Sequence, residues 1–499
     1  MSDVTASYDT SWRSLRQHQT PQWLRDAKFG IYTHWGVYSV PAFGPNGTWY
    51  PYLIYQDGTE QQKHHLATYG PLSEFGYKDF IPQLTAEKFD AAEWADLFKG
   101  AGARFAGPVG EHHDGFSMWD TRYSEWHAGR LGLQRDVVAE QEQAFRAAGL
   151  RFMVAHHHAA WWWFYPHWRR DFDTGAEHAS SLYGERHDLA WAKGGGPDLG
   201  ENGRDWAQQT PPSKAFLDQW LGKSKEVIDG FSPDLLWFDF GISMVQEHYV
   251  RDLLAYYYNH GAAAGQEVVA TYKWNHLVPG SALVDVELGR FSEQTYYEWP
   301  TDTSIDDQGA WSYVEDAAFK TPAAIIHNLV DNVSKNGYLL LNVGPRPDGT
   351  IPERAQEVLR SIGTWLEVHG EAIFETTPWR VFGEGPTQMA KAGPFSEQQE
   401  VTYTGRDIRY TAKGDSLYAI CLGWPGEEVR LTALSSAMAD RHADPFVYPD
   451  EVSGVSMLGS DQPLTWRQDP DALTIRCPEQ RPSEDAVVFK IERRNPYAS

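Results

Sequence analysis

Histidines and carboxylates gather at the ends of several short apolar runs in this sequence. The clusters are Thr33-His34-Trp35, Glu111-His112-His113-Asp114, His156-His157-His158, Trp237-Phe238-Asp239 and Asp285-Val286-Glu287. In a barrel of parallel strands the chemistry takes place at the carboxyl ends of the strands, where these residues would lie. A single histidine or carboxylate at a strand end is usually a structural cap. Such residues at five strand ends together indicate a functional site.

The carboxylates in these clusters suit the cleavage of a glycosidic bond. Side chains alternate along a strand, so Asp239 shares a face with Trp237, and Glu287 shares one with Asp285. Glycosidases use two carboxyl groups, one as nucleophile or base and the other as an acid with a raised pKa. The structural alternative is a buried carboxylate paired with Lys273 or Arg290, and the spacing alone does not separate the two interpretations.

The histidines favour either a metal site or the recognition of hydroxyl groups. His156 and His158 share a strand face, and His112 or Asp114 could join them, so a metal-dependent amidohydrolase barrel is an alternative function. Such sites usually begin with a His-x-His pair after the first strand, where this chain supplies only His34. Neutral imidazoles can instead donate to and accept from sugar hydroxyls. We therefore expect no metal and no other cofactor.

The elements that must position these residues alternate between strands and helices from about residue 28 to 375. The predicted strands are 29–33, 105–110, 152–156, 235–240, 268–273, 282–288 and 339–343, and the predicted helices are 87–99, 134–148, 215–229, 245–259, 322–334 and 352–368. An eighth strand would come from the weak segment 302–305. The pattern predicts an α/β fold, a TIM-like (β/α)8 barrel over residues 1–378, with a doubly wound sheet as the alternative.

The remainder of the chain, residues 379–499, predicts a C-terminal β-sandwich domain. The helical period disappears after Pro378, and the short strands 408–411, 416–421, 428–431 and 486–491 are separated by Gly, Pro and Asp turns. Within the barrel region, the intervals 40–85 and 161–213 lack clear periodicity. We expect them to form loops over the functional rim.

Composition restricts the partners. The 499 residues include 68 acidic and 43 basic side chains, a net charge of −25 that disfavours nucleic acids and anionic membrane surfaces. The sequence contains no run of about 18 apolar residues, so it predicts no membrane-spanning helix. The polar start lacks the features of a secretory signal, so we expect a cytoplasmic location. The two cysteines form no disulfide framework, and the sequence leaves the oligomeric state open.

Four motifs, in order, resemble those of the α-L-fucosidases of glycoside hydrolase family 29. They are Phe29-Gly30-Ile31-Tyr32-Thr33-His34-Trp35-Gly36-Val37-Tyr38-Ser39-Val40-Pro41, His112-His113-Asp114-Gly115-Phe116, Trp237-Phe238-Asp239 and Leu340-Leu341-Asn342-Val343-Gly344-Pro345. The resemblance covers about residues 20 to 380. It implies a TIM-like barrel that often lacks a regular helix, a C-terminal β-sandwich, and metal-free hydrolysis of terminal α-L-fucosyl units from fucosylated oligosaccharides or glycoconjugates with retention.

The resemblance also implies roles for individual residues. The nucleophile of the family falls on Asp239. The sugar-binding positions fall on His34, His112, His113 and Trp237, and His158 resembles a further sugar-contacting position. Fucose carries an apolar C6 methyl group, so Trp49, Trp119 and Trp311 are candidates for an apolar wall.

Two departures from the family pattern concern its glutamates. Thr48 stands where many members carry a Glu before Trp, and Pro300 stands where many carry the acid/base Glu. The acid/base must then come from Glu287, Glu293 or Glu298. We select Glu287, because the segment 285–290 resembles an Asp-x-Glu-Arg-Gly segment in part of the family, and Glu298 is second because a loop could bring it into the vacant position. The missing Glu also leaves open an inactive carbohydrate-binding barrel.

Overall fold

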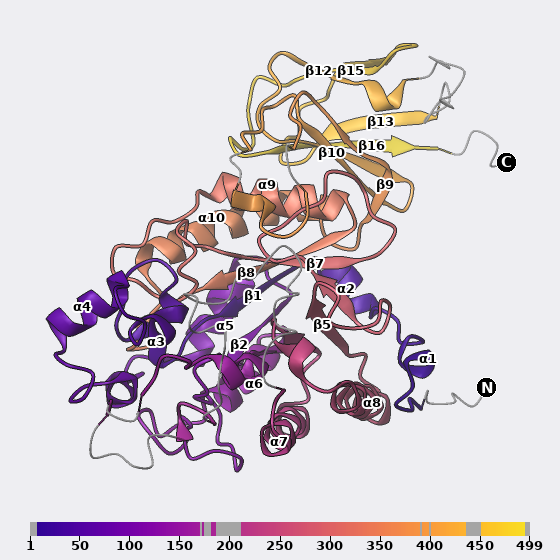
Figure 1. Cartoon of the computed structure of the whole chain (residues 1–499). Helices are drawn as coiled ribbons and strands as arrows, with labels where there is room; N and C mark the ends of the chain where they lie inside the picture. The colour runs from indigo at the N-terminus through magenta and orange to yellow at the C-terminus, as the bar shows by residue number, and fades with distance from the viewer. Residues whose placement is uncertain are drawn as a thin grey trace.

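The computed structural model describes residues 7–169, 172–173, 181–185, 211–389, 392–398, 401–435 and 451–494. A barrel of parallel strands is followed by antiparallel sheets, which lie beyond helices α9 (Pro322–Ser334) and α10 (Glu353–His369) (Figure 1). In the described part of the chain, no helix has the length and apolar character needed to cross a membrane.

Eight parallel strands form the barrel. They are β1 (Phe29–Thr33), β2 (Phe105–Glu111), β3 (Arg151–His156), β4 (Leu235–Phe238), β5 (Val269–Lys273), β6 (Leu283–Asp285), β7 (Trp299–Ser304) and β8 (Gly337–Val343). Their order in the sheet is β6-β5-β4-β3-β2-β1-β8-β7. Just beyond β6, the N–H of Val286 donates to Pro300 O and that of Leu288 to Asp302 O, both at 2.9 Å. These bonds nearly close the barrel, which confirms the predicted TIM-like fold and excludes a doubly wound sheet.

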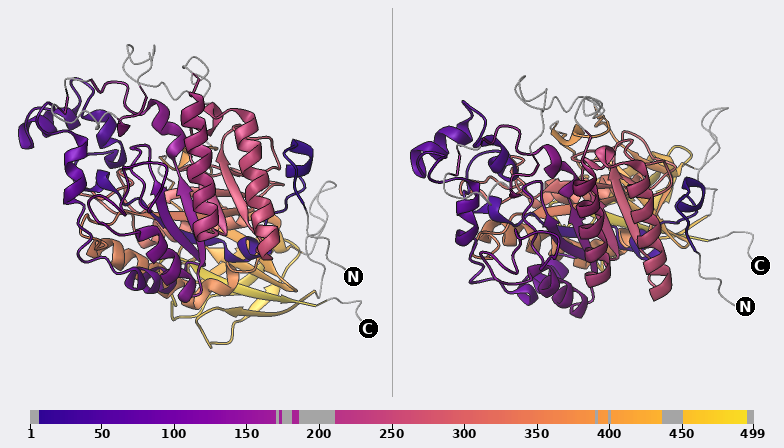
Figure 2. Two further views of the ribbon diagram at one scale, coloured as in Figure 1. Left: turned by 90° about the horizontal axis from the view of Figure 1, so that it is seen from below. Right: turned by 60° about the horizontal axis from the view of Figure 1, so that its bottom comes forward.

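Six helices on the outside of the barrel correspond to the six predicted ones. They are α5 (Ala91–Gly100), α6 (Val137–Ala147), α7 (Lys214–Phe231), α8 (Glu247–Ala264), α9 and α10. The N-cap side chains of Asp90, Asp136, Ser213 and Thr321 accept hydrogen bonds from the first turns of four of them, which sets where these helices begin. Helices α7 and α8 lie side by side on the outer face (Figure 2). The described residues 274–282 and 286–298, which flank β6, contain no helix.

Side chains alternate along each strand, and this alternation delivers polar groups to one end of the barrel. In β4, Leu235 and Trp237 point into an interior apolar cluster, and Asp239 follows them on the same face. Met153 and Ala155 occupy the same cluster in β3, so the residue that continues their face is His157. The apolar interior therefore ends in a layer of polar side chains at the carboxyl ends of the strands.

The interval 40–85 contains helices, which corrects the expectation that it is a loop. It holds α3 (Tyr50–Leu53), α4 (Glu60–Thr68) and two 3-10 turns, Gly47–Trp49 and Tyr77–Gln83, packed together through buried aromatic rings. The interval 161–213 lies largely outside the described residues. The chain enters the barrel through α1 (Trp12–Leu15) and α2 (Gln22–Ala27).

The C-terminal part contains two antiparallel sheets around a second apolar core, as predicted for a β-sandwich. The strands are β9 (Thr377–Glu384), β10 (Ile408–Lys413), β11 (Ser416–Cys421), β12 (Glu428–Leu431), β13 (Val452–Met457), β14 (Trp466–Gln468), β15 (Leu473–Arg476) and β16 (Val487–Arg493). One sheet has the order β13-β16-β11-β10-β9 and the other β12-β15-β14. Strand β9 starts at Thr377, next to the predicted domain boundary at residues 378 and 379. The division of the chain into two domains at that point stays a prediction.

Candidate active site

A pocket opens at the carboxyl ends of the barrel strands. It is lined by Tyr32, His34, Thr48, Trp49, His112, His113, His157, Trp237, Asp239, Phe240, Glu287, Asp302 and Trp311. The structure therefore brings together eight of the residues predicted for the site: Asp239, Glu287, His34, Trp49, His112, His113, Trp237 and Trp311. The lining combines three carboxyl groups with imidazoles and aromatic walls, which is a composition suited to a sugar ring.

Asp239 is held as an anion by the histidines around it. Its Oδ2 lies 3.1 Å from His157 Nδ1 and 3.3 Å from His113 Nε2. Burial by itself would raise the pKa of Asp239, but His157, His113 and Lys273 together bring this pKa well below its usual range. A buried carboxylate that stays ionised is suited to nucleophilic attack.

Glu287 has the opposite electrostatic environment. It lies just beyond β6, and its Oε2 is 3.2 Å from Lys273 Nζ. Burial, joined by the charges of Asp302 and Asp239 and opposed by Lys273, raises the pKa of Glu287 to about 8. Glu287 is therefore protonated near neutral pH, as a general acid must be.

A buried charge cluster forms the floor of the pocket. Lys273 Nζ donates to Asp285 Oδ1 at 2.6 Å and to Asp302 Oδ1 at 3.0 Å, and it lies 4.4 Å from the centre of the Trp237 ring. The Tyr32 hydroxyl donates to Asp302 Oδ2 at 2.9 Å, and Trp237 Nε1 donates to Asp285 Oδ2 at 3.3 Å. These bonds fix the Trp237 ring and the ammonium that faces Glu287. The structural alternative, a carboxylate paired with Lys273, applies to Asp285 and Asp302, and Glu287 contacts the same ammonium.

The orientation of His34 is set by Asn342. Asn342 Nδ2 donates to Ser304 Oγ at 2.8 Å and to the carbonyl of Trp311 at 2.6 Å, which turns Oδ1 toward His34. The backbone N–H of His34 donates to this oxygen at 3.0 Å, and His34 Nδ1 lies 2.8 Å from it. Nδ1 therefore carries the ring proton, and Nε2 remains as an acceptor for a hydroxyl group.

The imidazoles of His34, His112 and His157 are uncharged acceptors and donors. Burial lowers the pKa of His34 and of His112 well below the usual range, and it also lowers that of His157. Among the described residues, two triads have ligand atoms within 4.8 Å of one another: His34, His112 and His157, and His113, His157 and Asp239. The same neutral nitrogen atoms suit either sugar hydroxyls or a metal ion.

His158 does not line the pocket, which corrects its predicted role. It is fully buried, and its Nδ1 bonds the carboxylate of Glu111. That carboxylate also accepts from Lys223 Nζ at 2.7 Å and from Ser117 Oγ at 2.5 Å. His158 thus belongs to a structural ion-pair cluster behind the pocket, while the neighbouring His157 faces Asp239.

Glu298 lies at the other end of the barrel, so it is not a second acid/base candidate. It directly precedes β7, where its carboxylate binds Arg25 Nε at 2.8 Å and the Tyr338 hydroxyl at 2.7 Å. Pro300 is buried within β7. Trp119 is also absent from the pocket wall, because its buried ring donates to Glu226 at 2.9 Å.

Several pocket residues were not selected from the sequence: His157, Tyr32, Asp302, Thr48 as a contact, and Phe240. Strand alternation gave a signal for His157, which continues the inward face of Met153 and Ala155. Asp302 was hidden because its strand is short of apolar residues.

Comparison with known proteins identifies the family. The model of the α-L-fucosidase family matches residues 2–371, and the model of the α-L-fucosidase C-terminal domain matches residues 399–492. This chain belongs to the α-L-fucosidase family. It is a glycoside hydrolase, and neither the amidohydrolase nor the binding-only alternative is supported.

Individual α-L-fucosidases are similar to this protein over nearly the whole of its chain. The human tissue α-L-fucosidase is 30% identical over 492 residues, covering 97% of this chain and 90% of the relative, and the human plasma enzyme is 31% identical over 476 residues, covering 92% and 86%. The α-fucosidase of Thermotoga maritima, solved in complex with fucose, superposes with a TM-score of 0.74 at 27% identity and covers 97% of this chain and 100% of its own.

Proposed function

We propose that this α-L-fucosidase releases terminal α-L-fucosyl units with retention of configuration, with Asp239 as nucleophile and Glu287 as acid/base. The observation that carries the proposal is one pocket in which a buried carboxyl group, Asp239, and a half-buried one, Glu287, have pKa values displaced in opposite directions. Such a separation assigns an ionised and a protonated role to two otherwise similar groups. The groups are also close enough that the charge of Asp239 raises the pKa of Glu287.

The reaction then proceeds in two displacements. An oxygen of Asp239 attacks the anomeric carbon, the bond from that carbon to the leaving oxygen breaks, and Glu287 gives its proton to that oxygen. In the second step, Glu287 accepts a proton from water as the water oxygen attacks the anomeric carbon. The bond to Asp239 breaks, and both carboxyl groups return to their starting states.

The rest of the pocket supports recognition of a single terminal sugar. The nitrogens of His34, His112 and His157 face the same space and suit several hydroxyl groups at once. Trp49 and Trp311 supply apolar surface for ring carbons and for the C6 methyl of fucose. Because the charge cluster around Lys273 closes the floor, the substrate enters by its non-reducing end, which favours exo cleavage of fucosylated oligosaccharides or glycoconjugates.

The stereochemistry of the first product tests this mechanism. Proton NMR during hydrolysis of an aryl α-L-fucoside should show α-L-fucose first, before mutarotation produces the β anomer. Initial appearance of β-L-fucose would mean a single displacement, and the nucleophilic role of Asp239 would fall. A well-folded protein with no turnover of any fucoside would favour the binding-only alternative.

A further inference from the structure

The main chain of segment 286–290, which carries Glu287, makes hydrogen bonds to two different parts of the molecule. On one side its N–H groups at Val286 and Leu288 donate to carbonyls of β7, each at 2.9 Å. On the other side the barrel supplies no helix between β6 and β7, although all residues of this connection are described. The carbonyls of Val286 and Gly289 accept from Thr301 Oγ1 of β7 at 2.7 and 2.9 Å. Those of Glu287, Leu288 and Arg290 need partners from elsewhere in the molecule.

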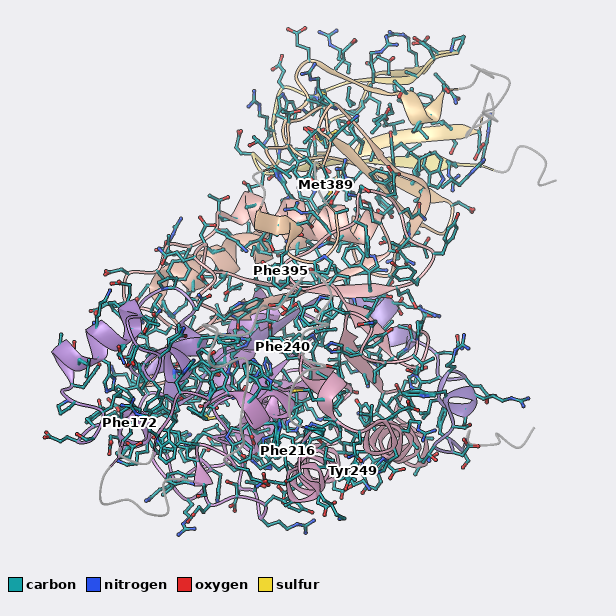
Figure 3. All side chains as sticks on the ribbon, viewed as in Figure 1. Phe172, Phe216, Phe240, Tyr249, Met389 and Phe395 are labelled. Carbon is teal, nitrogen blue, oxygen red and sulfur yellow. The ribbon has the colours of Figure 1, made fainter. Side chains whose placement is uncertain are left out.

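Those partners come from the C-terminal part of the chain. The 393–397 segment, Gly393-Pro394-Phe395-Ser396-Glu397, follows β9, and Phe395 lies between the C-terminal sheets and the barrel residue Phe240 (Figure 3). The N–H of Phe395 donates to the carbonyl of Glu287 at 2.8 Å, that of Glu397 to the carbonyl of Leu288 at 2.7 Å, and that of Gly393 to the carbonyl of Arg290 at 2.8 Å. The main chain of Glu287 itself is thus held from outside the barrel.

Side chains of the 393–397 segment reinforce this contact. Ser396 Oγ accepts from the N–H of Arg290 at 3.0 Å. The carboxylate of Glu397 lies 2.8 Å from Lys320 Nζ, and the same ammonium donates to Thr303 Oγ1 of β7 at 2.6 Å. The 393–397 segment is therefore tied both to the chain that carries Glu287 and to the next barrel strand.

The two segments approach so closely that Gly289 leaves no room for a side chain. A Cβ on Gly289 would lie 2.6 Å from the carbonyl oxygen of Gly393. Gly393 has φ +93°, and Phe395, a non-glycine residue, has φ +57°. Left-handed backbone is unfavourable for a residue with a side chain, so the surrounding bonds must hold Phe395 in place.

A buried ionic cluster fixes the same junction a few residues further on. Asp331 of α9 accepts from Arg409 Nε of β10 at 2.6 Å and from Lys335 Nζ at 2.8 Å. Lys335 Nζ also donates to the carbonyl of Phe291 at 2.9 Å. Charge-assisted bonds thus connect the C-terminal sheet, helix α9 and the chain that follows Glu287.

We propose that the 393–397 segment is a positioning element for Glu287, so that the C-terminal part of the enzyme contributes to the acid/base step. The proposal rests on the proposed function of Glu287. A general acid acts only within hydrogen-bond reach of the leaving oxygen. The main chain of Glu287 is held between β7 on one side and the 393–397 segment on the other. Asp239 and the pocket histidines come from other strands, so a shift of this segment affects proton transfer more than sugar binding.

Two glycines with similar backbone angles allow a matched test. Gly393 has φ +93° and Gly426 has φ +103°, and a Cβ on either would meet no atom within 4 Å. Gly393→Ala and Gly426→Ala should therefore introduce similar local strain, but only the first disturbs the contact with Glu287. Ser396→Ala is a second variant that removes the hydroxyl bonded to Arg290 without altering backbone preferences.

The measurement is kcat/KM for an alkyl α-L-fucoside, whose leaving group needs a proton, and for an activated aryl α-L-fucoside, whose leaving group does not. Gly393→Ala and Ser396→Ala should lower the value for the alkyl substrate about fivefold or more and that for the aryl substrate less than about twofold. Gly426→Ala should leave both within about twofold.

Equal losses on the two substrates, or no loss in either segment variant, would overturn the positioning role. Glu287→Ala, measured in parallel, distinguishes the acid/base role of Glu287 from the positioning role of the 393–397 segment. If Glu287→Ala discriminates between the substrates and the segment variants do not, only this inference fails. If Glu287→Ala shows no discrimination, the acid/base assignment fails and the inference fails with it. Should Gly393→Ala not fold, Ser396→Ala decides alone.

Discussion

Asp239 and Glu287 differ in which polar groups face them. Two histidines contact the carboxylate of Asp239, whereas Glu287 shares a single ammonium, that of Lys273, with Asp285 and Asp302. One ammonium cannot neutralise three carboxylates, so protons remain on the cluster at neutral pH. The pocket therefore supplies a nucleophile and an acid from similar side chains.

The pH profile should follow from these two groups. Glu287 must be protonated, so kcat/KM should fall as the pH rises through about 8. Asp239 must be ionised, so the acidic limb should lie below the range of an ordinary carboxylic acid. Titration of kcat/KM on an alkyl α-L-fucoside, whose leaving group needs a proton, measures both limbs. Glu287→Gln should abolish the alkaline limb, and its persistence near pH 8 in that variant would assign it to another group.

His157 and His158 should behave differently although they are neighbours. His157→Ala removes a contact to Asp239, so we expect kcat/KM to fall on the order of 100-fold with the fold intact. His158→Ala leaves the buried carboxylate of Glu111 short of a partner, so unfolding free energy should fall by about 3–5 kcal/mol. Urea denaturation and kinetics on both variants test this. A stable His158 variant with a weakened sugar affinity would restore its predicted role as a sugar contact.

At the scale of elements, periodicity predicted the barrel strands well where they are apolar. The strands around Ile31, Val154 and Leu341 were found nearly to the residue, because each is a short buried run. Strand β7 reads Trp-Pro-Thr-Asp-Thr-Ser and was recognised only in part, since its inward face is polar and its residues serve the pocket floor. Strands β13 to β15 escaped prediction, because their sequences have few consecutive apolar residues.

The same alternation explains the success and the failure at the site. Inward residues on β1, β4 and β6 led to His34, Asp239 and Glu287. The contact between the 393–397 segment and Glu287 joins positions more than 100 residues apart, and no local pattern encodes it. Glu298 was misplaced because the start of β7 was not recognised, so a residue at the bottom of the barrel was assigned to a loop at its top.

Helix packing offers an element-scale prediction with an internal control. Alanine exceeds glycine in helix propensity by about 1 kcal/mol. In α10, however, a Cβ on Gly363 would lie 1.9 Å from the carbonyl oxygen of Gly100 at the end of α5. Gly363→Ala should therefore destabilise the protein, while Gly230→Ala in α7, where a Cβ meets nothing within 4 Å, should be neutral or stabilising. Thermal unfolding of both variants measures the difference, and a rise in Tm for Gly363→Ala would contradict the packing.

At the scale of the whole molecule, the pocket depends on both parts of the chain. The barrel supplies the side chains, and the C-terminal part supplies backbone partners for the segment that carries Glu287. The aromatic content of the chain is likewise divided between structure and function: Trp49, Trp237 and Trp311 line the pocket, whereas rings such as Trp220 are fully buried in the core.

Metal removal tests whether the histidines bind hydroxyls. In the proposed mechanism the two triads around His157 hold sugar, so exhaustive dialysis against EDTA should leave kcat and KM unchanged. Elemental analysis of the purified enzyme should find well below one equivalent of zinc per chain. One equivalent of metal, with activity lost on chelation and restored on addition, would transfer the histidines to a metal site.

The central claim is that Asp239 forms a covalent bond to the sugar, and trapping that bond is its most direct test. A 2-deoxy-2-fluoro-α-L-fucosyl donor with a good leaving group should inactivate the enzyme in a time-dependent manner, because the fluorine slows breakdown of the intermediate. Mass spectrometry of the digested protein should then place one 2-fluorofucosyl group on the peptide that contains Asp239, through an ester to its carboxylate. A label on another carboxylate, or inactivation without any covalent adduct, would contradict the account.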